Sequence, residues 1–222
     1  MEFYHVLNRG VDKRNIFLDS QDYARFVHDM YEFNTLAPAL HVGRHASNMV
    51  DIVSRPSEAP GKELVDIHGW CLMGNHYHLI LSERIENGMS NFLRKLNVGY
   101  AKYFNKRYSR VGTLFQGRTK KVHICTDQHL LHILNYVHFN PLDLSNSNKD
   151  WRELKIADQN TALNHLLEYK WSSYKDYIGI KNFPSILTTT FFQEIFSQNY
   201  KAQVEKYLHD ISIDDIQHLT LE

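Results

Sequence analysis

Two strand-like runs that meet at a glycine–asparagine pair constrain this fold most. Residues 64–73 and 76–82 are rich in apolar side chains, which is typical of neighbouring strands. Gly74 and Asn75 both tolerate positive φ, so the pair predicts a tight turn between the two runs. Because strand side chains alternate between faces, His76 and His78 point the same way, about 6–7 Å apart. Two imidazoles on one face of a strand supply half of a divalent-metal site.

The sequence on either side of this hairpin predicts further strands and helices. Strands are marked by alternating or β-branched apolar residues, and helices by apolar residues that recur every three or four positions. The expected elements are strands at 3–9 and 119–124 and helices at 21–34, 89–108 and 128–139. Prolines, glycines and serines interrupt residues 35–65, which predicts a long insertion there.

The order of these elements predicts the fold class. Strand, helix, insertion, two strands, helix, strand and helix is the pattern of a ferredoxin-like split βαβ domain, which is an α+β fold. We therefore expect an antiparallel sheet with helices on one face and the two histidines on a central strand. The other face of the sheet would then be open to a ligand.

Signals for regular structure weaken after Pro141. A helical turn near 171–177 and two small helices at 191–197 and 201–211 are expected there. We expect residues 1–145 to form the main domain, with the insertion at about 35–65. Residues 146–222 would form a C-terminal extension of extra helices packed on the same domain. A chain of 222 residues is long enough for one core with such an appendage.

Composition and the N-terminus exclude several classes of protein. The hydrophobic content of 43% is ordinary for a soluble globular chain, and no apolar run approaches the roughly 20 residues that span a membrane. Residues 1–5 have neither the basic nor the apolar region of a secretory signal. Cys71 and Cys125 lie far apart and outside any CxxC pattern, which favours reduced thiols. We therefore expect a cytoplasmic protein without a membrane segment.

Charge is concentrated in one segment, although the net charge of the chain is zero. No acidic residue occurs from Asn87 to Thr126. The nine basic residues of this segment are Arg94, Lys95, Lys102, Lys106, Arg107, Arg110, Arg118, Lys120 and Lys121. Such a segment in a neutral chain suggests a local face that binds a polyanion such as nucleic acid, with a solvated helix face as the alternative.

The helix expected at 128–139 introduces two candidate functional residues. Tyr136 and Asn140 are four positions apart, so they lie on one helix face, one turn apart. A tyrosine hydroxyl can attack phosphorus when a metal polarises the phosphate. An asparagine carbonyl oxygen can ligate Mg²⁺ or Mn²⁺. A packed aromatic ring and a helix C-cap are the alternative interpretations of these two residues.

Five blocks of the sequence resemble the single-tyrosine HUH transposases, and most closely their REP-associated tyrosine transposase branch. The blocks are residues 4–10 (YHVLNRG), 73–79 (MGNHYHL), 112–118 (GTLFQGR), 136–141 (YVHFNP) and 171–174 (WSSY). They occur in the family's order and span about Tyr4 to Tyr177. One HUH motif is weak evidence, whereas five ordered blocks are strong.

The resemblance implies a metal-dependent nuclease and strand transferase that acts on single-stranded DNA. His76 and His78 would be the paired ligands of Mg²⁺ or Mn²⁺, and Asn140 matches the position of the third ligand. Tyr136 would attack the scissile phosphate and leave a 5′-phosphotyrosine and a free 3′-OH. The DNA would carry hairpin or palindromic repeat structure, and the protein would be nucleoid-associated, as a monomer or a homodimer.

The expected DNA contacts come from the basic segment and from the resembling blocks. The candidates are Arg9, Arg94, Lys95, Lys102, Lys106, Arg107, Arg110, Gln116, Arg118, Lys120 and Lys121. The chain departs from the family in two ways. Gly74 stands where the family often has proline, and the stretch 35–65 is longer than the family leads us to expect, so contacts of that stretch cannot be carried over.

Three other functions fit part of the pattern. A non-catalytic ferredoxin-like domain could bind nucleic acid through the aromatic side chains of its sheet and would need no metal. A metal hydrolase would activate water and would not need Tyr136. A replication initiator or relaxase of the HUH type would share the chemistry, although the resembling blocks favour a transposase.

Overall fold

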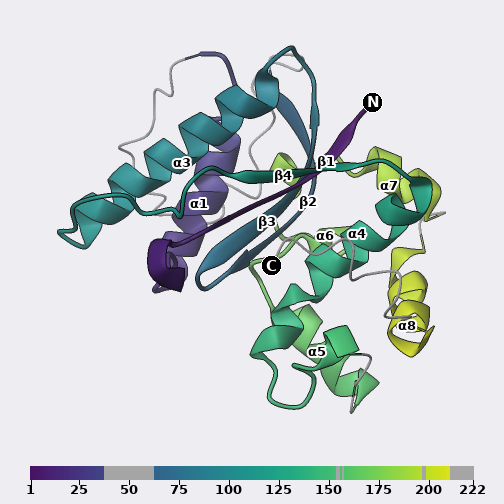
Figure 1. Cartoon of the computed structure of the whole chain (residues 1–222). Helices are drawn as coiled ribbons and strands as arrows, with labels where there is room; N and C mark the ends of the chain where they lie inside the picture. Colours follow the sequence, from purple (N-terminus) through teal and green to yellow (C-terminus); the bar gives the residue numbers. More distant parts are fainter. Residues whose placement is uncertain (38–62, 154–155, 157, 197–198, 211–222) are drawn as a thin grey trace.

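Four antiparallel strands form the sheet that carries both histidines (Figure 1). The computed structural model describes residues 1–37, 63–153, 156, 158–196 and 199–210. The strands are β1 (Phe3–Arg9), β2 (Val65–Met73), β3 (His76–Glu83) and β4 (Lys120–Ile124). They lie in the order β2-β3-β1-β4, so the histidine strand β3 is central, as the sequence predicts. The α+β class with an antiparallel sheet is confirmed.

One face of the sheet is covered by α1 (Ser20–Glu32) and α3 (Gly88–Arg107) (Figure 1). Both helices place an apolar stripe on the sheet, as the three- and four-residue spacing predicts. The ring centroid of Phe26 in α1 lies 4.9 Å from that of Tyr77 in β3 and 5.0 Å from that of Tyr100 in α3. This layer of two helices packs on the face of β3 that carries Tyr77 and holds the strand in place. The insertion expected at 35–65 falls largely at 38–62, outside the described residues.

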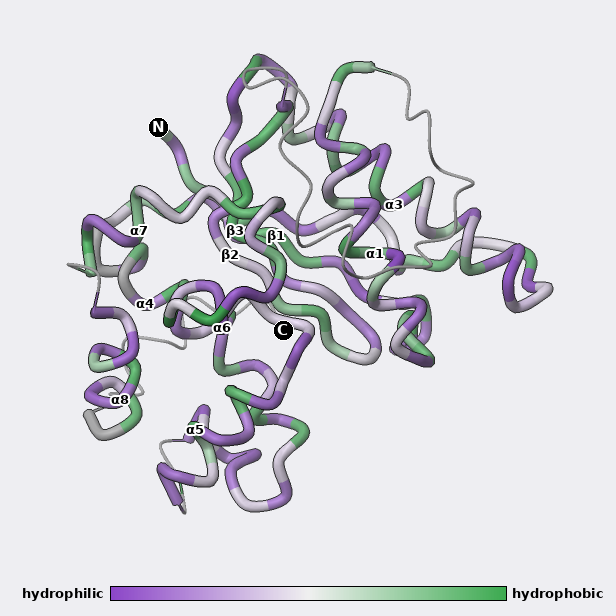
Figure 2. The backbone as a smooth tube through the Cα atoms, turned by 180° about the vertical axis from the view of Figure 1, so that it is seen from behind, coloured by the Kyte–Doolittle hydropathy of each residue, from purple (hydrophilic) through white to green (hydrophobic). Residues whose placement is uncertain are grey.

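The opposite face of the sheet is also covered, which corrects the expectation of helices on one face alone. There lies α4 (Asp127–Phe139), and around it are α5 (Gln159–Glu168), α6 (Tyr174–Tyr177), α7 (Thr190–Ile195) and α8 (Tyr200–Asp210) (Figures 1 and 2). The cause is the apolar character of that face, where Phe3, Cys71 and Ile80 need burial. At Gly69 the helix comes so close that an added Cβ would lie 2.8 Å from a methyl of Leu134.

The turn between β2 and β3 forms where the sequence predicts it, but by a different conformation. Neither Gly74 nor Asn75 has positive φ. The loop after β1 holds the turn instead: the amides of Ile16 and Phe17 donate to the carbonyl of Gly74 at 2.8 and 3.1 Å, and that of Gly10 donates to the carbonyl of Asn75 at 2.8 Å. The turn that precedes the two histidines is therefore fixed by its neighbours.

The C-terminal segment is fastened to the outer edge of β2. The amide of Leu72 donates to the carbonyl of Trp171 at 2.9 Å, and that of Ser173 donates to the carbonyl of Trp70 at 3.0 Å. Farther along, the amide of Thr188 donates to the carbonyl of Ile67. These bonds satisfy backbone groups that an edge strand would otherwise present to solvent. The division of the chain at residue 145 remains a prediction.

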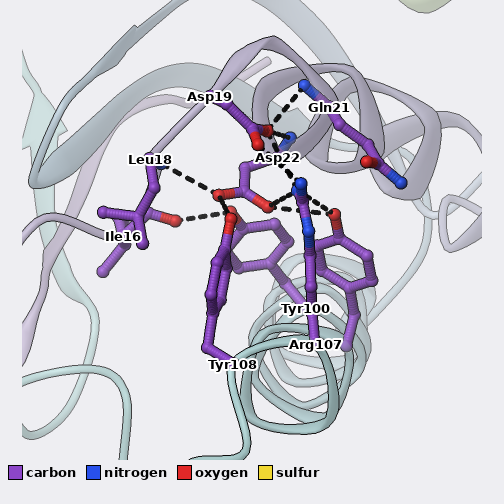
Figure 3. Close-up of polar contacts among 9 residues, drawn as sticks. Ile16, Leu18, Asp19, Gln21, Asp22, Tyr100, Arg107 and Tyr108 are labelled. Atoms are coloured by element: carbon purple, nitrogen blue, oxygen red, sulfur yellow. Dashed lines mark hydrogen bonds and ion pairs between the residues drawn. The ribbon is translucent and has the colours of Figure 1, made fainter.

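A buried carboxylate joins the start of α1 to the end of α3 (Figure 3). Asp22 is fully buried and accepts hydrogen bonds from the hydroxyls of Tyr103 and Tyr108, at 2.9 and 2.8 Å, and from Arg107. Arg107 also pairs with Asp19, the N-cap of α1, which holds the pKa of that carboxyl below its usual range. Burial raises the pKa of Tyr103 to about 12, so its hydroxyl stays a donor.

Two neutral histidines are part of the core on the α4 side of the sheet. The ring of His138 lies between the hydroxyls of Tyr200 and Ser173, at 2.8 and 2.7 Å. His68 contacts the hydroxyl of Ser82 at 2.8 Å. Burial lowers the pKa of His138 to about 3 and that of His68 to about 4. His138 is therefore a structural residue that links α4 to Ser173, the N-cap of α6, and to α8.

These histidines predict that the free energy of unfolding falls in acid. In the unfolded chain both imidazoles take up a proton near their ordinary pKa of about 6.5, and in the folded chain they do not. The stabilisation is complete above that value and decreases as the pH falls toward 4 and 3. In urea titrations between pH 4.5 and 6, each histidine should contribute a slope that approaches but does not exceed about 1.4 kcal/mol per pH unit.

A matched pair of variants isolates this effect. His138→Gln should reduce the slope by the share of one histidine, whatever it does to the absolute stability. Gln116→Asn, which changes an exposed side chain that does not titrate, should leave the slope as it is. Equal slopes in all three proteins would contradict the assignment of a neutral, buried His138.

Candidate active site

The paired histidines lie at the start of β3, on the face that α4 covers. Because β3 is hydrogen-bonded to β2 on one side and to β1 on the other, the backbone of the pair is held rigidly. Their ring centroids are 4.9 Å apart with an interplanar angle of 81°. His78 is fully buried and His76 is 7% exposed. The two imidazoles are thus brought together on one face, as the two-residue period predicts.

The hydrogen bonds of Asn75 select one tautomer of His76. The side-chain amide nitrogen of Asn75 donates to the carbonyl of Lys13 at 3.1 Å, so its oxygen is the atom that faces the imidazole. That oxygen lies 2.5 Å from Nδ1 of His76. An amide oxygen only accepts, so Nδ1 must carry the proton. In the neutral ring Nε2 then has the lone pair that a metal takes, an arrangement common among ligating histidines.

His5 is a residue of the site that the sequence did not single out as functional. Its Nε2 lies 2.9 Å from Nδ1 of His78, and the two rings stack at 5.1 Å with an interplanar angle of 15°. When Nδ1 of His78 donates this bond, its Nε2 carries the ligating lone pair. His5 belongs to the first resembling block, yet its contact with His78 depends on the pairing of β1 with β3, which spacing does not reveal.

Tyr136 lies on α4, and its ring packs against the rings of His78 and His5. Its ring centroid is 5.8 Å from that of His78 and 5.8 Å from that of His5, each in an edge-on arrangement. The side chain is 1% exposed. Tyr136 lies 60 positions after His76 in the sequence, and the structure brings it to the histidine strand as the sequence predicts. Its role as nucleophile remains a prediction.

Asn140 lies one turn beyond Tyr136, in a different environment from the one predicted. Its side-chain nitrogen donates to the carbonyl of Tyr136 at 2.8 Å, and its oxygen accepts from Nη2 of Arg152 at 2.9 Å. In the described part of the chain none of its hydrogen bonds joins it to a histidine. A carbonyl oxygen has two lone pairs, so one remains compatible with a metal. The observed contacts make Asn140 the end of α4 and an anchor of Arg152.

The donor set fits a divalent metal in part. Imidazole nitrogens suit transition metals, whereas Mg²⁺ and Mn²⁺ prefer oxygen ligands, so the two histidines, one with its tautomer fixed by Asn75, supply only part of such a site. Among the described residues, no group of three or more histidine, cysteine, aspartate or glutamate side chains is arranged around one point. Within the described part of the chain, Asn140 is the candidate for a third ligand, and water or the substrate could also supply one.

Six of the basic residues predicted to bind DNA are exposed in the structure. They are Arg94, Lys102, Lys106, Arg118, Lys120 and Lys121. The side chain of Gln116 is also exposed. Its backbone N–H donates to the backbone carbonyl of the half-buried Arg9 at 2.8 Å. That bond ties the 112–118 loop to the end of β1, so the third resembling block lies beside the first. These side chains remain candidates for contacts with the phosphate backbone of DNA.

Three of the predicted DNA contacts are engaged within the protein. Arg107 pairs with Asp19 and Asp22. The ammonium of Lys95 donates to the carbonyls of Thr35 and Ala37, and Arg110 binds the carbonyls of the loop that follows α3. The acid-free sequence window did not reveal these contacts, because their acceptors are backbone carbonyls or acids from another part of the chain.

Comparison with known proteins agrees with the sequence motifs. Residues 49–140 match the family described as "Transposase IS200 like". This span contains both histidines, the basic segment and Tyr136, so the match confirms the resemblance to the tyrosine transposases.

The chain was also compared with solved structures and with curated protein sequences. One solved structure that is similar is described as "Structure of the REP associates tyrosine transposase bound to a REP hairpin". It shares 13% identity, with 84% of this chain and 85% of that chain covered and a TM-score of 0.48. No curated protein sequence matches the chain significantly. Within the described residues, no helix is both long and apolar enough to cross a membrane.

Proposed function

We propose that this protein is a metal-dependent transposase that cuts and rejoins single-stranded DNA through a covalent tyrosine intermediate. The observation that carries the proposal is the contact of Tyr136 with the ring of His78, because both residues lie in the span that matches the transposase family. A tyrosine buried against one of the two paired histidines combines a nucleophile with imidazole ligands for a metal.

The proposed chemistry is an exchange of one phosphoester for another. The oxygen of Tyr136 forms a bond to the phosphorus, and the bond from phosphorus to the 3′ oxygen breaks. The phenol proton passes to water, and the leaving 3′ oxygen takes a proton from water. His76 and His78, through their Nε2 atoms, would hold Mg²⁺ or Mn²⁺. When bound, the ion polarises a non-bridging phosphate oxygen and offsets the charge that develops there.

The phosphotyrosine keeps the energy of the broken bond. A second 3′-OH can therefore attack it, release Tyr136 and join a new strand without an external energy source. This reversibility is what distinguishes a transferase from a hydrolase. We propose hairpin-forming single-stranded DNA as the substrate, as the resemblance implies, with the exposed basic residues around α3 and β4 on its phosphates.

Isothermal titration calorimetry with Mn²⁺ tests the metal site directly. We expect one site in the wild type and a loss of affinity of at least about 100-fold in His76→Ala and in His78→Ala, because even outer-shell changes typically cost 10–100-fold. His5→Gln, which alters only the partner of His78, should cost about 10–100-fold.

His123→Ala is the matched control, since it removes an exposed imidazole from the neighbouring strand β4. Its Mn²⁺ affinity should equal that of the wild type. If the variants at His76 and His78 also bound Mn²⁺ as tightly as the wild type, the metal would lie elsewhere.

A further inference from the structure

Arg152 places a partly exposed, positively charged side chain against the ring of Tyr136. It belongs to a single 3₁₀ turn, Trp151–Glu153, that comes after α4 in the chain. Its guanidinium carbon lies 5.6 Å from the ring centroid of Tyr136 and 4.6 Å from that of Trp151. Tyr136 and Asn140 are buried, whereas the Arg152 side chain is 27% exposed. The guanidinium thus carries a positive charge that lies against the Tyr136 ring and is also in contact with solvent.

Two anchors hold the guanidinium in a fixed orientation. Nη1 donates to the carboxylate of Asp143, and Nη2 donates to the side-chain oxygen of Asn140 at 2.9 Å. Asp143 is held in turn by the indole N–H of Trp151 at 2.7 Å. Asn140 is fixed by its bond to the carbonyl of Tyr136. The chain of bonds thus connects Arg152 to the backbone of the tyrosine itself.

We propose that Arg152 is a catalytic residue, which binds a non-bridging oxygen of the phosphate that Tyr136 attacks. The proposal rests on the proposed function. During the exchange of the phosphoester bonds, negative charge on the non-bridging oxygens must be offset, and a planar guanidinium matches that geometry. Because Asp143 and Asn140 hold the guanidinium beside the ring, it needs little reorganisation when the phosphate arrives. Arg152 forms and breaks no covalent bond in the step.

Oligonucleotides that differ only at the scissile phosphate test this role. One carries the normal phosphate and the other an uncharged methylphosphonate, and the rate of SDS-resistant adduct formation is measured with Mn²⁺. With the phosphate, Arg152→Ala should be slower than the wild type by about 10²–10³-fold, the usual cost of one such donor. With the methylphosphonate the difference should shrink to less than about threefold, because the charge that Arg152 offsets is gone.

A purely structural role predicts a different result. If Arg152 only held the turn in place, Arg152→Ala would lose the same factor on both oligonucleotides, and this would overturn the proposal. So would full activity of Arg152→Ala on the phosphate. Arg152→Lys, which keeps the charge without the planar fork, should recover part of the rate on the phosphate alone.

Arg84→Ala supplies the matched control. That arginine also forms ion pairs, with Asp66 and Glu63, but it follows the far end of β3 from His76. Its loss should change adduct formation equally little on both oligonucleotides. If the wild type itself formed no adduct with any hairpin DNA, the proposed function would fail and the role of Arg152 with it. An active wild type with equal losses in Arg152→Ala would remove the role of Arg152 alone.

Discussion

Replacement of Tyr136 by phenylalanine is expected to abolish covalent attachment to DNA while the fold remains. The variant loses one hydroxyl but keeps the ring that contacts His5, His78 and Trp151. We expect the yield of SDS-resistant adduct with hairpin DNA and Mn²⁺ to fall by more than about 10³-fold, since the hydroxyl that forms the proposed phosphotyrosine is gone. The midpoint of thermal unfolding should change by only a few degrees.

The control is Tyr174→Phe, which removes the hydroxyl of another buried tyrosine on the same side of the sheet. Its adduct yield should equal that of the wild type. Three outcomes would point to other functions. Adduct formation that survives in Tyr136→Phe would place the nucleophile elsewhere. Cleavage without an adduct, unaffected by the substitution, would indicate a hydrolase that activates water. Binding without cleavage by the wild type would indicate a non-catalytic nucleic-acid-binding domain.

Replacement of Asp22 by alanine is expected to lower the free energy of unfolding by more than replacement of the neighbouring Asp19. Asp22 is fully buried and accepts from Arg107, Tyr103, Tyr108 and the amide of Leu18, as Figure 3 shows in part. Its removal takes one acceptor from the partly buried guanidinium of Arg107 and from the partly buried hydroxyls of Tyr103 and Tyr108. Breaking a buried pair in this way typically costs about 3–5 kcal/mol. Urea unfolding at pH 7.5 measures the change in the free energy of unfolding.

Asp19→Ala provides the comparison, because Asp19 pairs with the same arginine but its side chain is 48% exposed. This variant loses an exposed ion pair and the N-cap of α1, together about 1–2 kcal/mol. A smaller loss in Asp22→Ala than in Asp19→Ala would show that the buried carboxylate is not the main link between α1 and α3.

Local patterns were sufficient to predict much of the fold and half of the site. The hairpin of β2 and β3, the helix that carries Tyr136 and the shared face of His76 and His78 follow from periods of two and 3.6 residues. The helix α5 was not predicted. Its sequence, QNTALNHLLE, is weakly apolar and lies after Pro141, where the periodic pattern of apolar residues weakens. Residue type also suggested the wrong turn conformation at Gly74, where contacts with the loop after β1 hold the turn.

The sequence by itself determined which side chains share a face of one element, because that depends only on the repeat of the backbone. It determined the histidine pair and the one-turn spacing of Tyr136 and Asn140. Only the tertiary structure decided which elements meet. The pairing of β1 with β3 brings His5 to His78, the return of the chain after α4 brings Arg152 to Asn140 and Tyr136, and the packing of α3 on α1 engages Arg107 with Asp22. These contacts join residues that are 12 to 85 positions apart, and no local period encodes them.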